Sequence, residues 1–151
     1  MKKMILICSL LVVMAGVKTS FAQTKPAVYT GAKAVLKHYK AVYMLNSGDE
    51  KKIGGTLRNM KNALDDPRLK GKLELELVAF GDGVAVYDKN GVFEKTLKEL
   101  QDRGVLLVQC ENTLKERHIE KSTLYDFINY APSGNGEIII LQQQGWAIVH
   151  P

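Results

Sequence analysis

The sequence predicts an α/β protein built on a mainly parallel β-sheet. Short apolar segments that are typical of buried strands alternate with segments of helical spacing. The connections between successive strand segments are too long for hairpins, which indicates βαβ units. Four strands are distinct and a fifth is less sharply marked. We therefore expect one sheet of four or five strands with helices packed against it.

The first predicted unit runs from residue 40 to residue 80. Residues 40–46 are rich in strand formers, and residues 72–80 form a second strand segment that becomes continuously apolar. Between them, apolar residues at steps of four, three and four predict a helix over 49–64, namely Ile53, Leu57, Met60 and Leu64. We expect Asp49 or Ser47 to cap this helix, and Asp65-Asp66-Pro67 to end it.

The second predicted unit leads to a cysteine. Residues 92–102 have one apolar and one charged side, which predicts a helix ending near Gly104. Residues 105–109 have the pattern of a buried strand that ends at Cys110, and Asn112-Thr113 can begin the next helix.

The C-terminal third is less regular. Residues 124–130 predict a short helix leading into a short strand that ends at Pro132, and residues 134–136 predict a loop. Residues 138–144 fit a strand by propensity and a helix by context. Residues 146–149 predict a final strand.

The N-terminus has the pattern of a secretory signal. A basic start at Lys2 and Lys3 precedes an apolar run, Met4–Val17, and a small-x-small cleavage site follows at residues 20–22. We expect a signal peptide over 1–22, a flexible lead-in over 23–37 and a single domain over 38–151. The alternative is an uncleaved N-terminal anchor. Cleavage predicts an exported protein, periplasmic or secreted, with no membrane attachment.

Charge adds little support for a nucleic-acid partner. The chain has 21 basic and 16 acidic residues, a net charge of +5. Three lysines lie within the predicted signal (Lys2, Lys3 and Lys18), so 18 basic residues oppose 16 acidic ones afterwards, or about +2. No basic cluster with interleaved aromatic residues remains, so we expect no nucleic-acid binding.

Cys110 is the main candidate for chemistry. Of the two cysteines, Cys8 lies in the predicted signal, so the mature chain has one thiol and cannot form an intramolecular disulfide. Ligand sites in parallel sheets lie beyond the carboxyl ends of strands, where Cys110 is expected. Helix N–H groups stabilise a thiolate there. The sequence leaves two interpretations open: a reactive thiolate, or a cysteine buried as a small apolar residue.

Other motifs point to no cofactor and no metal. Gly81-Asp82-Gly83 lacks the third glycine of a dinucleotide-binding loop, and no segment ends as a phosphate-binding loop does. The three histidines, His38, His118 and His150, lack the spacing of zinc ligands.

Several segments together resemble the DsrE/DsrF-like family of sulfur-metabolism proteins. The strand–cysteine–helix segment 104–113 carries the resemblance most clearly, and its order relative to other segments agrees. These segments are Asn46 with the following helix, residues 77–81, Pro132-Ser133-Gly134, Leu141-Gln142 and Gly145. The resemblance spans about residues 40–151.

The resemblance implies a three-layer α/β/α, flavodoxin-like fold with a five-stranded, mainly parallel sheet, and favours helix for residues 137–144. It also implies a trimeric or hexameric homo-oligomer, and a persulfide carried on Cys110. The candidate binding residues that follow are Asn46, Gly81, Asn112 and Thr113.

Three functions therefore follow as hypotheses. The first is a sulfur carrier, or sulfurtransferase-like protein, whose partner is a sulfur donor or acceptor protein or a small thiol. The second is a non-catalytic binding or assembly module with a structural Cys110. The third is a redox-responsive thiol that forms mixed disulfides.

Overall fold

The computed structural model describes residues 28–151. The predicted signal peptide and the first residues of the lead-in lie outside the described residues. Residues 28–38 form no helix or strand, and the first strand begins at Tyr39. The five strands of the described chain are β1 (Tyr39–Leu45), β2 (Leu73–Ala79), β3 (Leu106–Cys110), β4 (Asn129–Ala131) and β5 (Ala147–Val149).

The helices alternate with these strands along the chain. The α-helices are α1 (Glu50–Asp65), α2 (Glu94–Asp102), α3 (Glu111–Arg117) and α4 (Gly134–Gln143), and two short 3-10 helices are η1 (Gly81–Tyr87) and η2 (Lys121–Thr123). Every pair of neighbouring strands is parallel, which confirms the predicted α/β fold class and the five-stranded parallel sheet.

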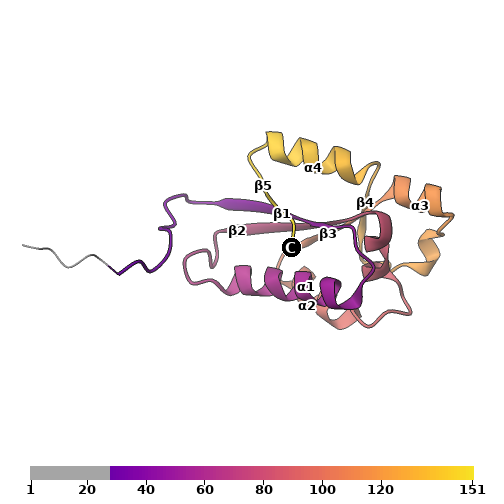
Figure 1. Cartoon of the computed structure of the whole chain (residues 1–151), viewed down its shortest axis with the longest axis horizontal. Coiled ribbons are helices and arrows are strands. Elements are labelled where there is room, and N and C mark those ends of the chain that lie inside the picture. Colours follow the sequence, from indigo (N-terminus) through magenta and orange to yellow (C-terminus); the bar gives the residue numbers. More distant parts are fainter. Residues whose placement is uncertain (1–27) are drawn as a thin grey trace, which may run out of the picture. The chain divides into compact units, whose positions relative to one another are not determined.

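The strand order, β4-β3-β2-β1-β5, decides which face each helix covers. From β1 to β4 the chain steps across the sheet in one direction, and then β5 returns to the far side of β1. Because crossovers between parallel strands are right-handed, this reversal places the last helix on the opposite face. Figure 1 shows α4 on one side of the sheet and α1 and α2 on the other, which makes three layers.

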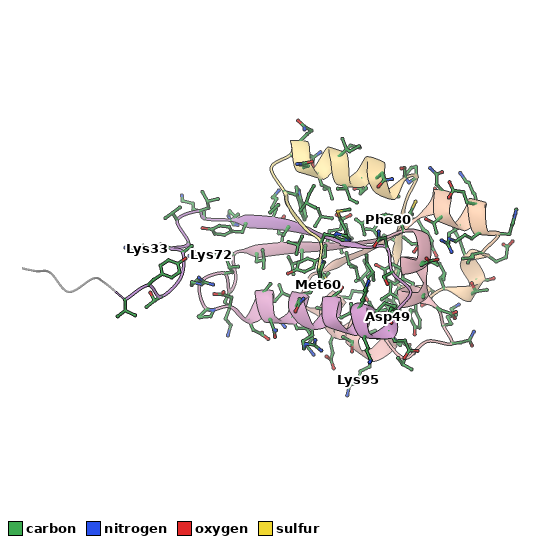
Figure 2. The ribbon with its side chains drawn as sticks, viewed as in Figure 1. Lys33, Asp49, Met60, Lys72, Phe80 and Lys95 are labelled. Atoms are coloured by element: carbon green, nitrogen blue, oxygen red, sulfur yellow. The ribbon has the colours of Figure 1, made fainter. Side chains whose placement is uncertain are left out.

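The face covered by α1 and α2 holds the larger core. Met60 of α1 is fully buried there (Figure 2), together with Leu57 and with Leu97 and Leu100 of α2. These helices pack on every second residue of the strands, such as Leu75, Leu77 and Ala79 of β2. Asp49 caps α1, accepting a hydrogen bond from the Lys52 N–H at 2.9 Å, so the first of the two predicted caps is the observed one.

The opposite face holds a smaller core under α4 alone. Its six buried apolar residues are Val42, Val78, Val108, Ala131, Ile138 and Leu141. Phe80, labelled in Figure 2, and Trp146 pack against this cluster. The helix α4 begins near the carboxyl ends of β2 and β3, where Gly134 packs against Phe80 and Cys110.

Residues 134–136, predicted as a loop, form the first turn of α4, so that prediction is wrong. The hydroxyl of Ser133 accepts a hydrogen bond from the Gly136 N–H at 3.2 Å and starts the helix. Residues 138–143 continue as helix, as the family resemblance favoured and the isoleucine-rich propensity did not. Tertiary packing decides the outcome, because Ile138 and Leu141, three residues apart, both face the sheet.

The region before β4 also differs from the prediction. The short helix expected within 124–130 lies earlier, as η2, and residues 124–128 are irregular. The 3-10 helix η1 after β2 is a further element that the sequence pattern does not predict. Gly83 in η1 lies so close to the main chain of β1 that a Cβ atom would stand 2.0 Å from the Leu45 carbonyl oxygen. Only glycine permits this approach.

Candidate functional site

Cys110 ends β3 and immediately precedes α3, as the N-cap residue of that helix. In register it lies beside Ala131 of β4, and its neighbour Gln109 lies beside Ala79 of β2. The side chain is only 5% exposed. The thiol therefore lies at the carboxyl edge of the sheet, where parallel-sheet proteins bind ligands, but beneath the surface.

The sulfur of Cys110 is surrounded by hydrogen-bond donors from two helices. The backbone N–H groups of Gly134, Thr113 and Asn112 and the hydroxyl of Thr113 all hydrogen-bond to it. Asn112 contributes least, and its N–H also donates to the Pro132 carbonyl at 3.3 Å. The donors thus come from the starts of both α3 and α4.

These donors decide the ionisation of the thiol. Burial of Cys110 is the largest single effect and raises the pKa, because the anion loses water. The hydrogen bonds from Gly134, Thr113 and Asn112 together outweigh it and lower the pKa of Cys110 below its ordinary value. The site therefore stabilises the thiolate relative to that of an ordinary cysteine, and it does so through neutral hydrogen-bond donors.

Gly134 fits this place because it has no side chain. A Cβ atom there would stand 3.2 Å from the Cβ of Cys110 and 3.1 Å from the Cβ of Phe80. Contacts this short force neighbouring atoms apart. The glycine therefore lets α4 start directly on top of the cysteine, with its N–H at the sulfur.

Thr113 connects the cysteine to the end of β2. Its hydroxyl oxygen accepts a hydrogen bond from the Gly81 N–H at 2.9 Å while the hydroxyl also bonds to the sulfur. Thr113 is 4% exposed, so this hydroxyl has little access to water. Gly81 has φ +55°, a left-handed conformation that suits glycine, and it aims its N–H at the threonine.

A pocket of about 220 Å³ lies over this group. Its rim carries both signs of charge: Arg117 makes an ion pair with Asp82 at 2.7 Å, and Glu116 lies nearby. The lining residues are Phe80, Gly81, Cys110, Asn112, Thr113, Glu116, Arg117, Ser133 and Asn135. The pocket is large enough for a small sulfur compound or the end of a peptide side chain.

Four of the five site residues predicted from the sequence line this pocket together: Cys110, Gly81, Asn112 and Thr113. Asn46 is not among the lining residues. It is exposed at the end of β1, and its carbonyl oxygen is 3.9 Å from the place of a Cβ on Gly81. The structure thus places Asn46 at the same edge of the sheet but outside the pocket.

Gly134, Ser133 and Arg117 belong to the site but are not among the site residues predicted from the sequence, although Pro132-Ser133-Gly134 contributes to the family resemblance. The signal that would have revealed the first two is a serine cap followed by an apolar helical pair, which the β-branched run at 138–140 conceals. Arg117 lies in the helix that follows Cys110. Its place at the pocket depends on the ion pair with Asp82, a contact between distant segments.

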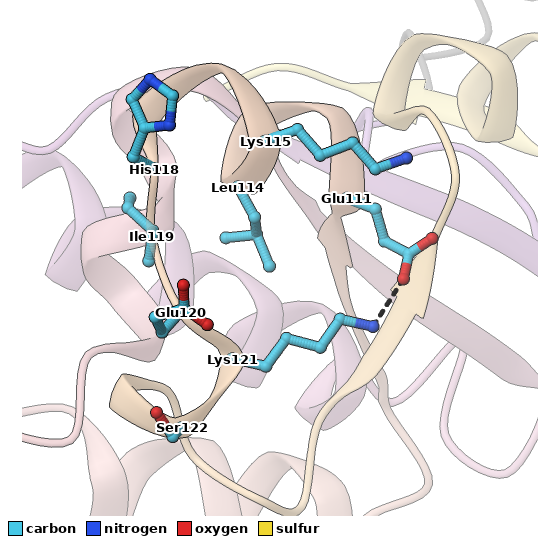
Figure 3. A pocket seen from close by; sticks show the side chains of 8 residues that line it. All are labelled: Glu111, Leu114, Lys115, His118, Ile119, Glu120, Lys121 and Ser122. Atoms are coloured by element: carbon cyan, nitrogen blue, oxygen red, sulfur yellow. Dashed lines mark hydrogen bonds and ion pairs between the residues drawn. The ribbon is translucent and has the colours of Figure 1, made fainter.

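A second and larger hollow lies on the other side of α3, between α3 and η2. Its volume is about 530 Å³, and it is lined by Glu111, Leu114, Lys115, His118, Ile119, Glu120, Lys121 and Ser122. Figure 3 shows the ion pair between Lys121 and Glu111 at its rim. Its lining contains no cysteine and no buried titratable group, so the smaller pocket is the better candidate for chemistry.

Within residues 28–151, no three histidine, cysteine or acidic side chains gather in a way that could hold a metal ion. No helix in this part of the chain is both long enough and apolar enough to cross a membrane.

Comparisons with known proteins agree with this geometry. The chain resembles a solved protein of unknown function, MTH1491 from Methanobacterium thermoautotrophicum, at 27% identity and a TM-score of 0.70. It shares the fold of the YchN protein from E. coli at 16% identity and a TM-score of 0.60. Each match covers 75% of this chain and 99% of the other. No curated protein shows significant sequence similarity to the chain.

A comparison with models of protein families assigns the chain to a family. The model of the DsrE/DsrF-like family matches residues 40–151, which include the cysteine pocket and nearly all of the sheet. The chain therefore belongs to the DsrE/DsrF-like family, a family related to sulfur relay.

Proposed function

We propose that this protein carries sulfane sulfur as a persulfide on Cys110. The observation that carries the proposal is the sulfur atom held by N–H groups at the starts of two helices, at the base of a pocket of about 220 Å³. Membership of the DsrE/DsrF-like family supports the choice of sulfur over other thiol chemistry.

The transfer step needs only a thiolate and a persulfide donor. The Cys110 thiolate attacks the outer sulfur of a donor R–S–SH, and a new S–S bond forms on Cys110. The S–S bond of the donor breaks, its electron pair leaves as the thiolate R–S⁻, and the transferred sulfur keeps its hydrogen. An acceptor thiolate reverses the same step, so no external oxidant is required.

The donors around Cys110 act on its own sulfur atom in both directions of the transfer. They stabilise the attacking thiolate, and they stabilise the same thiolate as the leaving group when an acceptor takes the outer sulfur. The N–H of Gly134 and the hydroxyl of Thr113 approach the sulfur from different helices. Charge-assisted hydrogen bonds of this kind are about twice as strong as neutral ones.

The test is the intact mass of the folded protein after exposure to glutathione persulfide. We expect a gain of one sulfur atom that dithiothreitol removes, and no gain in Cys110→Ser. Iodoacetamide titration should place the pKa of the thiol below its ordinary value of about 8.5. A thiol that alkylates readily yet never gains sulfur would exclude the carrier function.

Two other functions remain as alternatives with distinct outcomes. The 5% exposure of Cys110 favours a structural thiol in a binding or assembly module. In that case native Cys110 would resist alkylation at every pH. A redox-responsive thiol would instead add glutathione as a mixed disulfide, which differs from one sulfur atom in mass.

We also propose that the chain assembles as a homo-oligomer. Four exposed apolar side chains on α4 and on strands β3 and β5 support this: Ile139 is 60% exposed and Ile140 54%, with Leu106 and Ile148 less so. Burial of such side chains against a second copy is favourable. Light scattering of the wild type and of Ile140→Lys tests it, since the substitution should reduce the mass of the particle.

Export is the last part of the proposal. The basic start and the apolar run Met4–Val17 support cleavage after Ala22. The mass of the protein recovered outside the cytoplasm should correspond to a chain that begins at Gln23, and recovery of the whole chain at the membrane would indicate an anchor instead.

A further inference from the structure

We propose that Glu76 and Glu137 form a carboxyl pair that gates access to Cys110. With Glu76 protonated, α4 packs on the sheet and covers the sulfur; when both carboxyls are ionised, their repulsion loosens α4 and exposes it. The inference concerns regulation of the site and rests on the proposed function only for its biological use.

Glu76 lies in the middle of the central strand β2, on the face that α4 covers. It is 2% exposed, and its Oε1 atom is buried with no hydrogen-bond partner in the part of the chain that the structure describes. Its register neighbours are Val42 of β1 and Leu106 of β3, and neither can neutralise a carboxylate. A buried charge without a partner is costly, so the neutral acid is favoured.

Within residues 28–151, the groups that face Glu76 add no compensating cation. Glu137, in the first turn of α4, is the charged group whose field opposes ionisation of Glu76. Lys40 of β1 is on the same face but pairs with Glu74 at 3.7 Å. Tyr87 of η1, also sensitive to the charge on Glu76, is neutral in this pH range because its own pKa is raised well above 10 by burial. Burial, and secondly Glu137, raise the pKa of Glu76 to about 7.

The link between this pair and the cysteine is α4 itself. Glu137 stands three residues after Gly134, on the same first turn. Gly134 packs so closely on Cys110 that a Cβ atom added to it would stand only 3.2 Å from the cysteine Cβ, and its N–H hydrogen-bonds to the sulfur. A movement of this turn away from β2 therefore uncovers Cys110 and removes one of its hydrogen bonds.

The expected size of the effect follows from linkage. In a loosened state Glu76 would regain its ordinary pKa of 4.5, against about 7 when α4 is packed. Between pH 6 and pH 8 the equilibrium for loosening should then increase roughly tenfold. Because Cys110 is only 5% exposed, loosening should accelerate its alkylation, and the change in rate reports this equilibrium.

The experiment compares iodoacetamide alkylation of the wild type and Glu76→Gln between pH 6 and pH 8. Dividing the wild-type rate by the variant rate removes the ionisation of the thiol itself. We expect this ratio to increase roughly tenfold across the range. Hydrogen exchange of α4 amides, corrected for its intrinsic pH dependence, should show the same trend in the wild type and none in Glu76→Gln.

Two further variants test whether the pH dependence comes from Glu76 and Glu137. Glu74→Gln changes an exposed carboxyl on the same strand and face, and should retain the pH dependence of the wild type. Glu137→Gln removes the repulsion while leaving Glu76 in place, and should weaken the dependence. A ratio that stays constant between pH 6 and pH 8 would overturn the gate. A gate without sulfur uptake on Cys110 would overturn the proposed function but leave this inference standing.

Discussion

The two faces of the sheet are built differently, although one set of strands supplies both. The α1 and α2 face joins twenty buried residues into one core, whereas the α4 face has six under a single helix. The core of the first face contains no carboxylate. The second face contains Glu76, which is buried without a hydrogen-bond partner for Oε1. We therefore expect the α1 and α2 face to contribute most of the stability, and the α4 face to be the one that responds to pH.

The cysteine lies where the weaker face meets the carboxyl edge of the sheet. Gly134 of α4 covers it from one side, and Thr113, which is anchored to Gly81, holds it from the other. The threonine belongs to a segment that packs into the larger core through Leu114. One set of donors to the sulfur is thus rigidly supported, and the other depends on a single helix. Substitutions on the two faces should therefore differ in their effects on the free energy of unfolding and on the reactivity of Cys110.

The largest expected effect is a difference between two core substitutions, one that lowers stability alone and one that also changes the reactivity of Cys110. Leu57→Ala, on α1, removes a fully packed side chain and should lower the free energy of unfolding by about 3 kcal/mol. The alkylation rate of Cys110 should change little while the protein is folded. Ile138→Ala, on α4, should cost about 2 kcal/mol but accelerate alkylation several-fold. Urea unfolding measures the loss of stability, and iodoacetamide alkylation measures the reactivity of Cys110. Equal changes in the alkylation rate in the two variants would refute the distinction between the faces.

The next effect is a dependence of stability on pH. The folded-state pKa of Glu76, about 7, is raised above its ordinary 4.5, so the folded state binds the proton more tightly. Stability from this group is therefore greatest at low pH and falls as pH rises from about 4.5 to 7. After allowance for screening, the loss between pH 5 and pH 8 should be about 2 kcal/mol.

Glu76→Gln is the control for that measurement. The variant carries a neutral side chain of the same shape, so its unfolding free energy should lack this decline. Chemical denaturation of both proteins at several pH values gives the difference directly. Parallel curves would mean that Glu76 is already ionised in the folded protein.

The smallest expected effect comes from Thr113, the hydrogen-bond donor on the rigidly supported side of Cys110. Thr113→Val should leave the Gly81 N–H unpaired and remove one donor from the sulfur, which costs about 1 kcal/mol and raises the pKa of Cys110. Thr56→Val is the matched control: Thr56 is similarly buried, but its hydroxyl donates to the Lys52 carbonyl within α1. Absorbance of the thiolate at different pH values should shift for the first variant alone.

Much of the fold and part of the site were predictable because they depend on local pattern. The apolar spacing of 49–64 and the turn at Asp65-Asp66-Pro67 place α1 to within a residue. Cys110 between a buried strand and a helix start is visible in the sequence for the same reason. Gly81, Asn112 and Thr113 could be named as site residues, and the structure brings them to one pocket.

The parts that were not predictable depend on contacts between distant segments. Residues 138–140 are three isoleucines, whose local preference is for strand, yet they are helical in α4. The return of the chain from β4 to the far side of β1 requires a crossover helix there, and no local signal records that requirement.

The sequence by itself determined the alternation of strands and helices and the position of Cys110 at a strand end. These follow from side-chain periodicity, which acts over neighbouring residues. Only the tertiary structure decided that Gly134 lies on Cys110 and that Glu76 is buried near Glu137. Burial and pKa depend on what packs against a side chain, and the packing partners here are 24 and 61 positions away in the chain.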